Sequence, residues 1–577
     1  MLRYGIKELH FKDGTAEPIP PTGLTVIVGP NNAGKSALLR EINMAVQNDA
    51  VPPQYSFWLR SITVEREQDQ TKFDEWFNKL GRSVPSWMRH ANNSDFGIWD
   101  NSGQQFLSRE EARSLWFQSP HLGLLARHVV AHLEASARGS IPLSTGPRDP
   151  LTTAFDPIHK LWDDRTLEQS FSRMVKRAFG FDICINRFTQ QLRLLVGSVQ
   201  MGPETLPPSR ELMEEYAKLK GVDEQGDGVK SFVGILLTTI ASEMPLVLID
   251  EPEAFLHPPQ ARLLGKYLVE ETPEDGQVLV ATHSGDVIEG ILDSKNGKEV
   301  KIVRVAQNSL GNRKVSQLPP HRVANLWSDP LLRYSRMLDG LFQRGVILCE
   351  SDGDCRFYSA SLDVHLSGEV EHDLHLTHTN GKARFAKALR ELRAFGVQSA
   401  VIGDIDILND KKLMRALIEA AGEDWISCEA DLDILLEEVK SRASGATVRD
   451  LKPAVQGVIN RPDGSSISDT ESSTIIKAVR NKSGWTDLKR SGFSSLEGPT
   501  RQATMRLVSR LERAGIFIVP VGELERWFPD LNAGHGPSFV TAALESGAHA
   551  TPTIELRDFM QKIVDYFGIE IETECEE

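Results

Sequence analysis

Long apolar segments and an export signal are both missing from the sequence. No apolar run approaches the roughly 18 residues that cross a membrane, which argues against a membrane protein. The opening "MLRYGIKELHFKDG" has no basic stretch followed by an apolar core, as a secretory signal would have. We therefore expect a cytoplasmic protein.

Cysteine is scarce, and basic residues are outnumbered. The five cysteines form no CxxC pair and no cluster with histidine, which argues against a disulfide framework and against a zinc site. The net charge of −15 weighs against a surface that attracts phosphate everywhere, although a local basic groove can coexist with an acidic whole. Charge alone therefore leaves nucleic acid open as a partner.

The order of apolar strands and helices predicts two α/β domains. The 577 residues exceed the roughly 250 to 300 at which a single core stops growing. We expect a first domain over 1–320 that carries an irregular inserted subdomain at about 52–135. A helical connector at 321–344 would lead to a second domain over 345–577, with a parallel sheet and a mostly helical insertion at about 410–515.

One glycine-rich stretch matches a nucleotide-binding motif. "GPNNAGKS" fits GxxxxGK[ST] and lies between an apolar strand, "LTVIVG", and a helical pattern, which is the context the motif requires. A chance glycine-rich turn is the alternative. In the functional interpretation, backbone N–H groups and the helix amino terminus bind phosphates, Lys35 reaches the β- and γ-phosphates, and Ser36 ligates Mg²⁺. The nucleotide-binding candidates here are Gly29, Asn32, Gly34, Lys35 and Ser36.

Two later strands end in residues that suit ATP hydrolysis. "LVLIDEPEAFLHPPQ" places Asp250 and Glu251 after a buried strand, where Asp250 can support Mg²⁺ and Glu251 can polarise the attacking water. "VLVATHS" ends in His283, which could sense the γ-phosphate. Alone, a histidine at a strand end would more often be a core residue. Together the three motifs predict an ATPase.

Carboxylates follow two strands of the second domain. "GVILCESDGDC" places Glu350 and Asp354 after one strand, and "VIGDIDI" places Asp404 and Asp406 after another. In extended conformation the last two would point to the same side. Because carboxyl ends of parallel strands meet at one edge, these acids would converge and need a cation such as Mg²⁺ or Mn²⁺. The alternative is solvated turns and helix caps, which Asp352 fits in particular.

The first 310 residues or so resemble the ABC-type ATPases of chromosome maintenance and recombination, in which "DEPE…LHP" is characteristic wording. In that family a signature stretch before the acidic strand completes the nucleotide site of a second subunit. "QGDGVKSF" lies in that place, with Gly226 and Gly228, but departs from the usual Ser-Gly-Gly wording. The resemblance implies that hydrolysis requires a homodimer or higher oligomer, with dimerisation elements expected within 150–220.

"ESDGD…THTNGK…VIGDID" resembles a Toprim domain, whose pattern is a glutamate after the first strand and Asp-x-Asp after the third. A Toprim domain joined to an ABC ATPase is similar to the OLD (overcoming lysogenization defect) nucleases, which include the Gabija nuclease. The resemblance implies two metal sites, the first near Glu350, Asp354 and Asp404, and the second near Asp406 and Glu525. Glu523 is the less favoured substitute for Glu525. The family's late basic residue would be Lys489 or Lys562.

These resemblances imply an ATP-regulated, metal-dependent endonuclease that cleaves DNA, with Glu350, Asp404, Asp406, Glu251 and Glu525 as catalytic residues and a role in antiphage defence. A topoisomerase is less favoured because none of the seven tyrosines has a suitable setting, and a primase because no zinc-binding module is present. RNA such as tRNA is an alternative substrate, and a nucleic-acid clamp that does not cut is an alternative function. An accessory protein and the direction of ATP control stay open.

Overall fold

The computed structural model describes most of the chain, and it divides into two compact units, Met1–Trp327 (unit 1) and Ser328–Glu577 (unit 2), which are considered separately. Residues 321–336 of the expected connector lie outside the described part. Within 337–344, Met337–Phe342 form a 3₁₀ helix shortly before the first strand of unit 2. No helix among the described residues is long and apolar enough to cross a membrane. The described ranges are 2–48, 56–83, 96–99, 106–135, 143–149, 153–154, 156–199, 207–294, 300–307, 313–318, 337–366, 373–442, 448–460, 466–479, 484–531 and 533–569.

Unit 1 is built on a six-stranded sheet in the order β16-β15-β3-β14-β13-β8. All neighbours pair in parallel except β16, which is antiparallel to β15. β13 and β14 are buried at every residue, as their unbroken apolar sequences predict for strands covered on both faces. The strands of this sheet are β3 (Gly23–Val28), β8 (Val130–Leu133), β13 (Leu246–Asp250), β14 (Gln277–Ala281), β15 (Val300–Gln307) and β16 (Arg313–Leu318).

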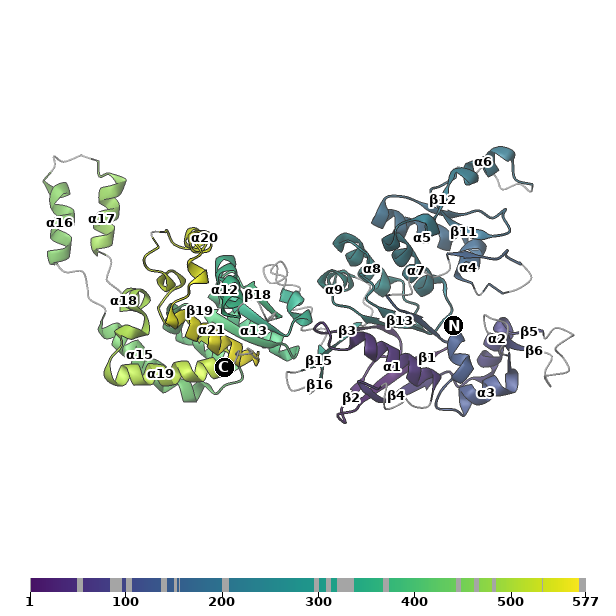
Figure 1. The fold of residues 1–577 in the computed structure, drawn as a ribbon, viewed down its shortest axis with the longest axis horizontal. Coiled ribbons are helices and arrows are strands. Elements are labelled where there is room, and N and C mark those ends of the chain that lie inside the picture. Colours follow the sequence, from purple (N-terminus) through teal and green to yellow (C-terminus); the bar gives the residue numbers. More distant parts are fainter. Residues whose placement is uncertain are drawn as a thin grey trace, which may run out of the picture. The chain divides into compact units, whose positions relative to one another are not determined.

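Helix α1 (Lys35–Gln47) lies between this sheet and a smaller one of order β2-β1-β4 (Figure 1). Its buried Leu38, Leu39 and Ile42 join residues of both sheets in one apolar core. The small sheet consists of β1 (Tyr4–Phe11), β2 (Ala16–Pro18) and β4 (Leu59–Arg66). This packing fixes the helix at the end of β3, which is where the glycine-rich motif lies.

The expected irregular insertion at 52–135 is wrong in part. β4 pairs along the length of β1, and β8 pairs with β13 in the main sheet, so both ends of that range are regular core strands. Long-range pairing of this kind leaves no local signal in the sequence, which explains the error. Between them lie α2 (Gln70–Leu80), α3 (Arg109–Phe117), a 3₁₀ helix (Gly123–His128), and short strands β5 (Arg82–Ser83), β6 (Phe96–Trp99) and β7 (Phe106–Ser108).

The rest of unit 1 adds helices and a small antiparallel sheet of β9, β10, β11 and β12. Its strands are β9 (Ser144–Thr145), β10 (Ile183–Ile185), β11 (Leu192–Val196) and β12 (Lys220–Gly221). The helices are α4 (Pro157–Asp163), α5 (Arg165–Phe179), α6 (Arg210–Lys218), a 3₁₀ helix (Val222–Glu224), α7 (Asp227–Ala241), α8 (Pro258–Glu270) and α9 (Gly285–Leu292).

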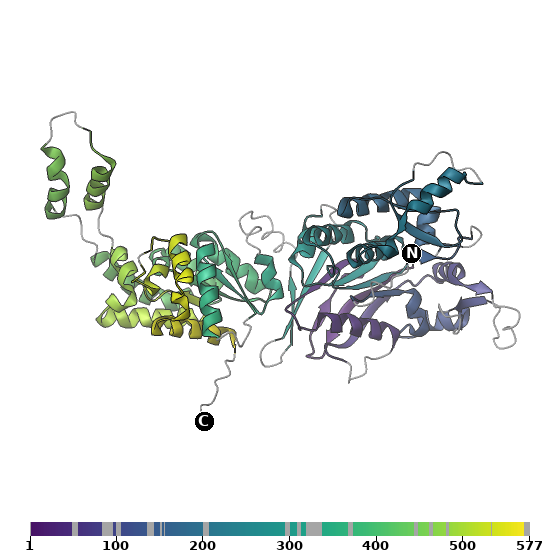
Figure 2. The ribbon, with the colours of Figure 1, turned by 45° about the horizontal axis from the view of Figure 1, so that its top comes forward.

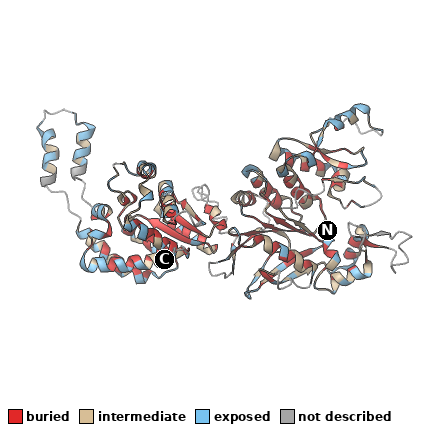
Figure 3. Cartoon of the chain, in the orientation of Figure 1, coloured by how far each residue is buried: buried red, intermediate tan, exposed pale blue. Residues whose placement is uncertain are grey.

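Unit 2 contains the predicted parallel sheet, in the order β18-β17-β19-β20. Its strands are mostly buried, and Figure 3 shows them as the red centre of the unit. Ile347, Cys349 and Ala400 point to a core shared with α12 and the carboxy-terminal helix α21. The strands are β17 (Gly345–Cys349), β18 (Leu374–His378), β19 (Gln398–Gly403) and β20 (Ile516–Ile518).

Helices surround this sheet and fill most of 410–515. In both views of the fold, α16 and α17 lie side by side as a helical pair (Figures 1 and 2). The helices are α12 (Asp352–His365), α13 (Phe385–Ala394), α14 (Lys411–Ala420), α15 (Trp425–Ser441), α16 (Val448–Ile459), α17 (Asp469–Val479), α18 (Gly484–Ser491), α19 (Gly498–Arg513), α20 (Pro537–Glu545) and α21 (Ile554–Phe567). The 3₁₀ helices are Lys382–Arg384, Ile405–Asn409, Gly492–Ser495, Leu524–Trp527 and Ala548–Ala550.

Candidate active sites

The glycine-rich loop of unit 1 joins β3 to α1, as the motif predicts. Gly34 precedes α1 with φ 84°, in the left-handed region. A Cβ at Gly29 would lie 2.0 Å from the carbonyl oxygen of Val305, so no side chain fits there. Lys35 Nζ donates hydrogen bonds to the carbonyl oxygens of Gly29 and Pro30, both at 2.9 Å. The ammonium group thus lies against the loop whose N–H groups suit phosphate.

Ser36 and Asp250 meet at the start of α1. Ser36 Oγ donates a hydrogen bond to Asp250 Oδ1 at 2.9 Å, which brings together the two positions expected to serve Mg²⁺. Asn32, in the same loop, has φ 59°, a conformation that asparagine adopts more readily than most residues. Burial lowers the pKa of Lys35, while the nearby Glu251 carboxyl opposes that shift. The loop, the lysine and the acids after β13 are therefore one electrostatic group.

His283 lies beside the acids that follow β13. Its Nδ1 is 3.2 Å from Glu253 Oε1 and 3.6 Å from Glu251 Oε1. Glu253 Oε1 also accepts hydrogen bonds from Thr282 Oγ1 and from the backbone N–H of His283, both at 2.9 Å. Burial raises the pKa of Glu253, and His283 opposes the rise. The expected alternative for His283, a satisfied core residue, does not fit its 43% exposed side chain.

The signature stretch forms the start of α7. Gly226 is the residue before the helix, and Gly228 lies in its first turn. A Cβ at Gly228 would lie 2.5 Å from the carbonyl oxygen of Phe255, so α7 packs closely on the loop after β13. Phe255 has φ 68°, and its side chain is 63% exposed. An aromatic residue rarely adopts this backbone conformation, which marks the loop as strained.

In unit 2, Glu350 directly follows β17, and Asp354 lies in the first turn of α12. The residue that caps α12 is Ser351, whereas Asp352 is the first helical residue and pairs with Arg356 at 2.8 Å. Asp354 Oδ2 accepts a hydrogen bond from the Ser351 backbone N–H at 2.8 Å and completes a capping box. The cap interpretation thus holds in part, but for Ser351 and Asp354 rather than Asp352.

Asp404 and Asp406 follow β19, but not as an extended pair. Asp404 precedes a 3₁₀ helix that begins at Ile405, and Asp406 lies within it. The prediction that both point to one side of a strand is therefore wrong, because the chain turns into a helix directly after Gly403. Asp406 instead forms ion pairs with Lys382 Nζ at 2.9 Å and Lys489 Nζ at 2.8 Å.

These acids influence one another electrostatically. The pKa of Asp404 is raised to about 8, chiefly by burial and then by the negative charges of Asp354, Asp406 and Glu350. Burial also raises the pKa of Glu350, with Asp406 and Asp354 adding to the shift and Lys382 opposing it. Burial works in the same direction on Asp406, but the two lysine hydrogen bonds outweigh it and hold its pKa below the usual value. The group carries more negative charge than its lysines balance.

The structure separates the two candidate lysines. Lys489, from α18, contacts Asp406. Burial lowers the pKa of Lys489, but this hydrogen bond and the charges of the neighbouring acids together outweigh burial and raise it. Lys562 pairs with Glu512 at 2.7 Å instead. Lys382, in the "THTNGK" stretch after β18, was not predicted. Its position at the carboxyl end of a neighbouring strand is the signal that could have identified it.

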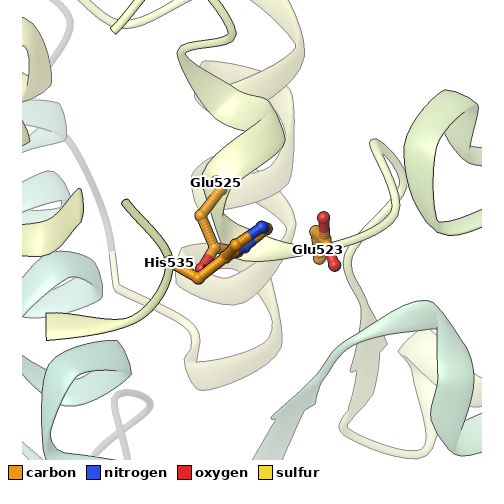
Figure 4. A group of neighbouring side chains, drawn as sticks. All are labelled: Glu523, Glu525 and His535. Carbon is orange, nitrogen blue, oxygen red and sulfur yellow. The ribbon is translucent and has the colours of Figure 1, made fainter. Parts of the chain in front are cut away.

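Glu525 lies at the edge of this group, and its partners differ from those expected. Its Oε1 accepts a hydrogen bond from the Gly536 backbone N–H at 2.8 Å and lies 3.4 Å from His535 Nδ1. It adds to the raised pKa of Asp354, a shift that burial dominates. Among the described residues, the group whose oxygen and nitrogen ligand atoms all lie within 4.8 Å of one another is Glu523, Glu525 and His535 (Figure 4). The expected five-acid set does not form such a tight cluster.

Comparisons with known proteins place the chain among ATPases and beside known nucleases. A family model described as "AAA domain, putative AbiEii toxin, Type IV TA system" matches residues 214–288, which contain α7, the acids after β13 and His283. The Old nuclease of Escherichia phage P2 is 22% identical over 256 residues, and the OLD nuclease of Thermus scotoductus is 24% identical over 322 residues. The predicted similarity to the OLD nucleases is confirmed. Unit 1 has a P-loop ATPase fold.

The matches to the OLD nucleases are partial. They cover 40% and 49% of this chain, and 41% and 58% of the phage and Thermus proteins. Solved structures with some likeness include the SMC head domain of Thermotoga maritima, at 13% identity, over 55% of this chain and 99% of that one, with a TM-score of 0.27. An Smc head domain from Pyrococcus furiosus has 12% identity over 56% and 99%, with a TM-score of 0.33. TM-scores this low do not establish a shared fold across the chain.

Proposed function

We propose that this chain is an ATP-binding and ATP-hydrolysing, divalent-metal-dependent endonuclease of the OLD type, whose unit 2 is a Toprim domain. The observation that carries the proposal is the partly buried acidic group at the carboxyl ends of β17 and β19, where Asp404, with a pKa of about 8, lies near Glu350, Asp354 and Asp406. Its similarity to two proteins named as nucleases supports the same assignment.

The chemistry of these residues suits a divalent cation, although the five acids do not lie as close together as Glu523, Glu525 and His535. Each donor is a carboxylate oxygen, which Mg²⁺ and Mn²⁺ prefer. Burial first, and then the neighbouring carboxylates, raise the pKa of Asp404, so a bound cation would stabilise its charged form. Glu350, Asp354 and Asp404 would hold one ion, with Asp406 and Glu525 nearest a second. Bound there, such ions supply an activated water and stabilise the leaving oxygen of a phosphodiester.

The two lysines supply the positive charge that a nucleic-acid backbone needs. Lys382 and Lys489 reach Asp406 from different elements and place both ammonium groups beside the acidic group. A phosphate oxygen that enters between them gains charge-assisted hydrogen bonds. We assign Lys489 the role of the late basic residue near the scissile phosphate. Lys562, which is paired with Glu512, has no such role.

Unit 1 would bind ATP with Mg²⁺ at the loop, Lys35, Ser36 and Asp250. Glu251 would orient the attacking water, and His283 would contact the γ-phosphate side of that group. We also propose that Gly226 and Gly228 face the nucleotide of a second copy in a homodimer. The close packing of Gly228 on the Phe255 carbonyl would transmit that contact to the loop behind Glu251. A defence role and an accessory protein belong to the same proposal.

A substrate matrix tests the proposed reaction. The purified full chain is incubated with supercoiled plasmid, linear duplex DNA, single-stranded DNA and tRNA, each with and without ATP, and with Mg²⁺, Mn²⁺ or EDTA. We expect nicking or cleavage of DNA that needs the divalent ion and changes with ATP. Binding of DNA without any product, under every condition, would favour the clamp or scaffold. If only tRNA is cleaved, the substrate is RNA and not DNA.

A further inference from the structure

A nitrogen ligand lies next to the acidic group, from a segment that the sequence motifs do not include. His535 precedes α20, in a turn bounded by Gly534 and Gly536, and Gly536 has φ 68°. The Gly536 backbone N–H donates to Glu525 Oε1 at 2.8 Å, which ties the turn to the 3₁₀ helix at 524–527. The imidazole therefore stays within reach of the two glutamates.

The three side chains point toward one another (Figure 4). Besides its backbone hydrogen bond, Glu525 Oε1 lies 3.4 Å from His535 Nδ1, and Glu523 Oε1 lies 3.6 Å from Arg526 Nε. The side chains of Glu523 and Glu525 are 16% and 19% exposed, whereas that of His535 is 79% exposed. Two half-buried oxygen donors are thus joined by a nitrogen donor that solvent ions can reach.

Two electrostatic interactions connect this trio with the acidic group and with Lys489. Glu525 raises the pKa of Asp354, after the larger effect of burial. Glu523 raises that of Lys489, which otherwise responds to burial and to Asp406. The trio is therefore electrostatically continuous with the proposed nuclease site, and an ion held there would sit beside the carboxylates that follow β17.

We propose that Glu523, Glu525 and His535 bind a divalent transition-metal ion, with Mn²⁺ as its working probe, in preference to Mg²⁺. Mg²⁺ prefers a shell of oxygen ligands, whereas an imidazole favours later first-row metals. His535 thus sets the metal preference at this end of the site. The part this ion plays in cleavage rests on the proposed function, but its binding does not.

The test measures metal binding directly on the full chain after its metals have been removed with EDTA. Mn²⁺ and Mg²⁺ affinities are measured by calorimetry, and pulsed electron paramagnetic resonance records the ¹⁴N coupling of an imidazole bound to Mn²⁺. The variants are His535→Ala and, as a matched histidine outside the trio, His549→Ala. Because the His535 side chain is mostly exposed, its removal does not threaten the fold.

We expect a ¹⁴N coupling in the parent chain and in His549→Ala that is lost in His535→Ala. The Mn²⁺ affinity of that site should fall at least about tenfold in His535→Ala, which corresponds to ~1.4 kcal/mol, while Mg²⁺ affinity changes far less. A parent chain without the coupling, or a coupling that survives in His535→Ala, overturns the inference and leaves an ordinary histidine–glutamate ion pair.

The metal test and the cleavage test can fail separately. A chain that cleaves no nucleic acid but shows the His535-dependent coupling loses the proposed function and keeps the metal site. A chain that cleaves DNA but shows no ¹⁴N coupling that depends on His535 keeps the function and loses this inference.

Discussion

The two candidate sites occupy the same kind of place, the carboxyl ends of parallel strands, but they balance charge in opposite ways. In unit 1, Lys35 and Ser36 are held by the loop and by Asp250, and the acids after β13 face a histidine. In unit 2, four partly buried acids outnumber the two lysines beside them, and burial and the neighbouring acids raise the pKa of Asp404 to about 8. We propose that the first site receives an anion, the phosphates of a nucleotide, and that the second receives a divalent cation.

The variant Asp404→Asn should give the largest effect, and it tests whether the acidic group of unit 2 binds a metal ion. It removes a charge that we assign to metal binding, so cleavage should fall by about a thousandfold or more, the loss of several kcal/mol of transition-state stabilisation. ATP affinity should not change, because unit 1 provides that site. Plasmid nicking and nucleotide titration measure the two effects.

Asp352→Asn is the matched control for that variant. Asp352 lies in the same acidic stretch but pairs with Arg356 on the surface, and both side chains are more than half exposed. Cleavage by this variant should stay near that of the parent. Equal losses in both variants would mean that the acidic stretch acts only by its overall charge.

The variant Lys489→Ala tests whether the positive charge of Lys489 contributes to cleavage in unit 2. Loss of one hydrogen-bond donor to a reacting phosphate should lower the cleavage rate about a hundredfold. Lys562→Ala should have little effect, because its surface pair with Glu512 contributes roughly 1 kcal/mol or less. Single-turnover cleavage rates of the two variants test this assignment. A larger loss of rate in Lys562→Ala than in Lys489→Ala would refute it.

Lys35→Ala tests the anion-binding side of the comparison. Loss of a charged hydrogen-bond donor to phosphate should weaken ATP binding by about 10- to 100-fold. Divalent-metal binding to unit 2 should be unaffected. Calorimetric titration with a non-hydrolysable ATP analogue measures the first effect, with Lys266→Ala, a surface lysine near Glu270, as the control. An unchanged affinity would contradict the phosphate-binding role of the loop.

The smallest expected effect is on the pH dependence of stability. The folded-state pKa of Asp404 is raised from 3.8 to about 8, so between those values the folded chain keeps a proton that the unfolded chain has lost. Protonation therefore favours folding, and this contribution to stability is lost as pH rises toward 8.

Melting temperatures of the metal-free chain measure this trend. We expect the Tm to fall by a few degrees more between pH 5 and pH 8 in the parent than in Asp404→Asn, and Mg²⁺ to raise the parent's Tm more at the higher pH. Parallel curves for the two proteins would show that Asp404 is not the group responsible.

The sequence predicted what short-range patterns determine. Contiguous motifs determine the loop between β3 and α1, the acids after β13 and the alternation of strands and helices along the chain in unit 2. The structure contains all three. Asp406 was misplaced because a 3₁₀ helix starting at Ile405 leaves no clear pattern in five residues. Lys382, Lys489 and His535 approach the acids from separate elements, so only three-dimensional packing could select them.

Asp354 has two roles because of the capping box at the start of α12. Its side chain accepts a hydrogen bond from the Ser351 backbone N–H and so stabilises the first turn of the helix, and its carboxyl is also part of the acidic group. Replacement by alanine removes both at once, whereas asparagine keeps an oxygen that can still cap the helix. A survey of inactivating substitutions would therefore find position 354 intolerant for two reasons, and only the alanine–asparagine contrast would tell a broken helix start from a missing ligand.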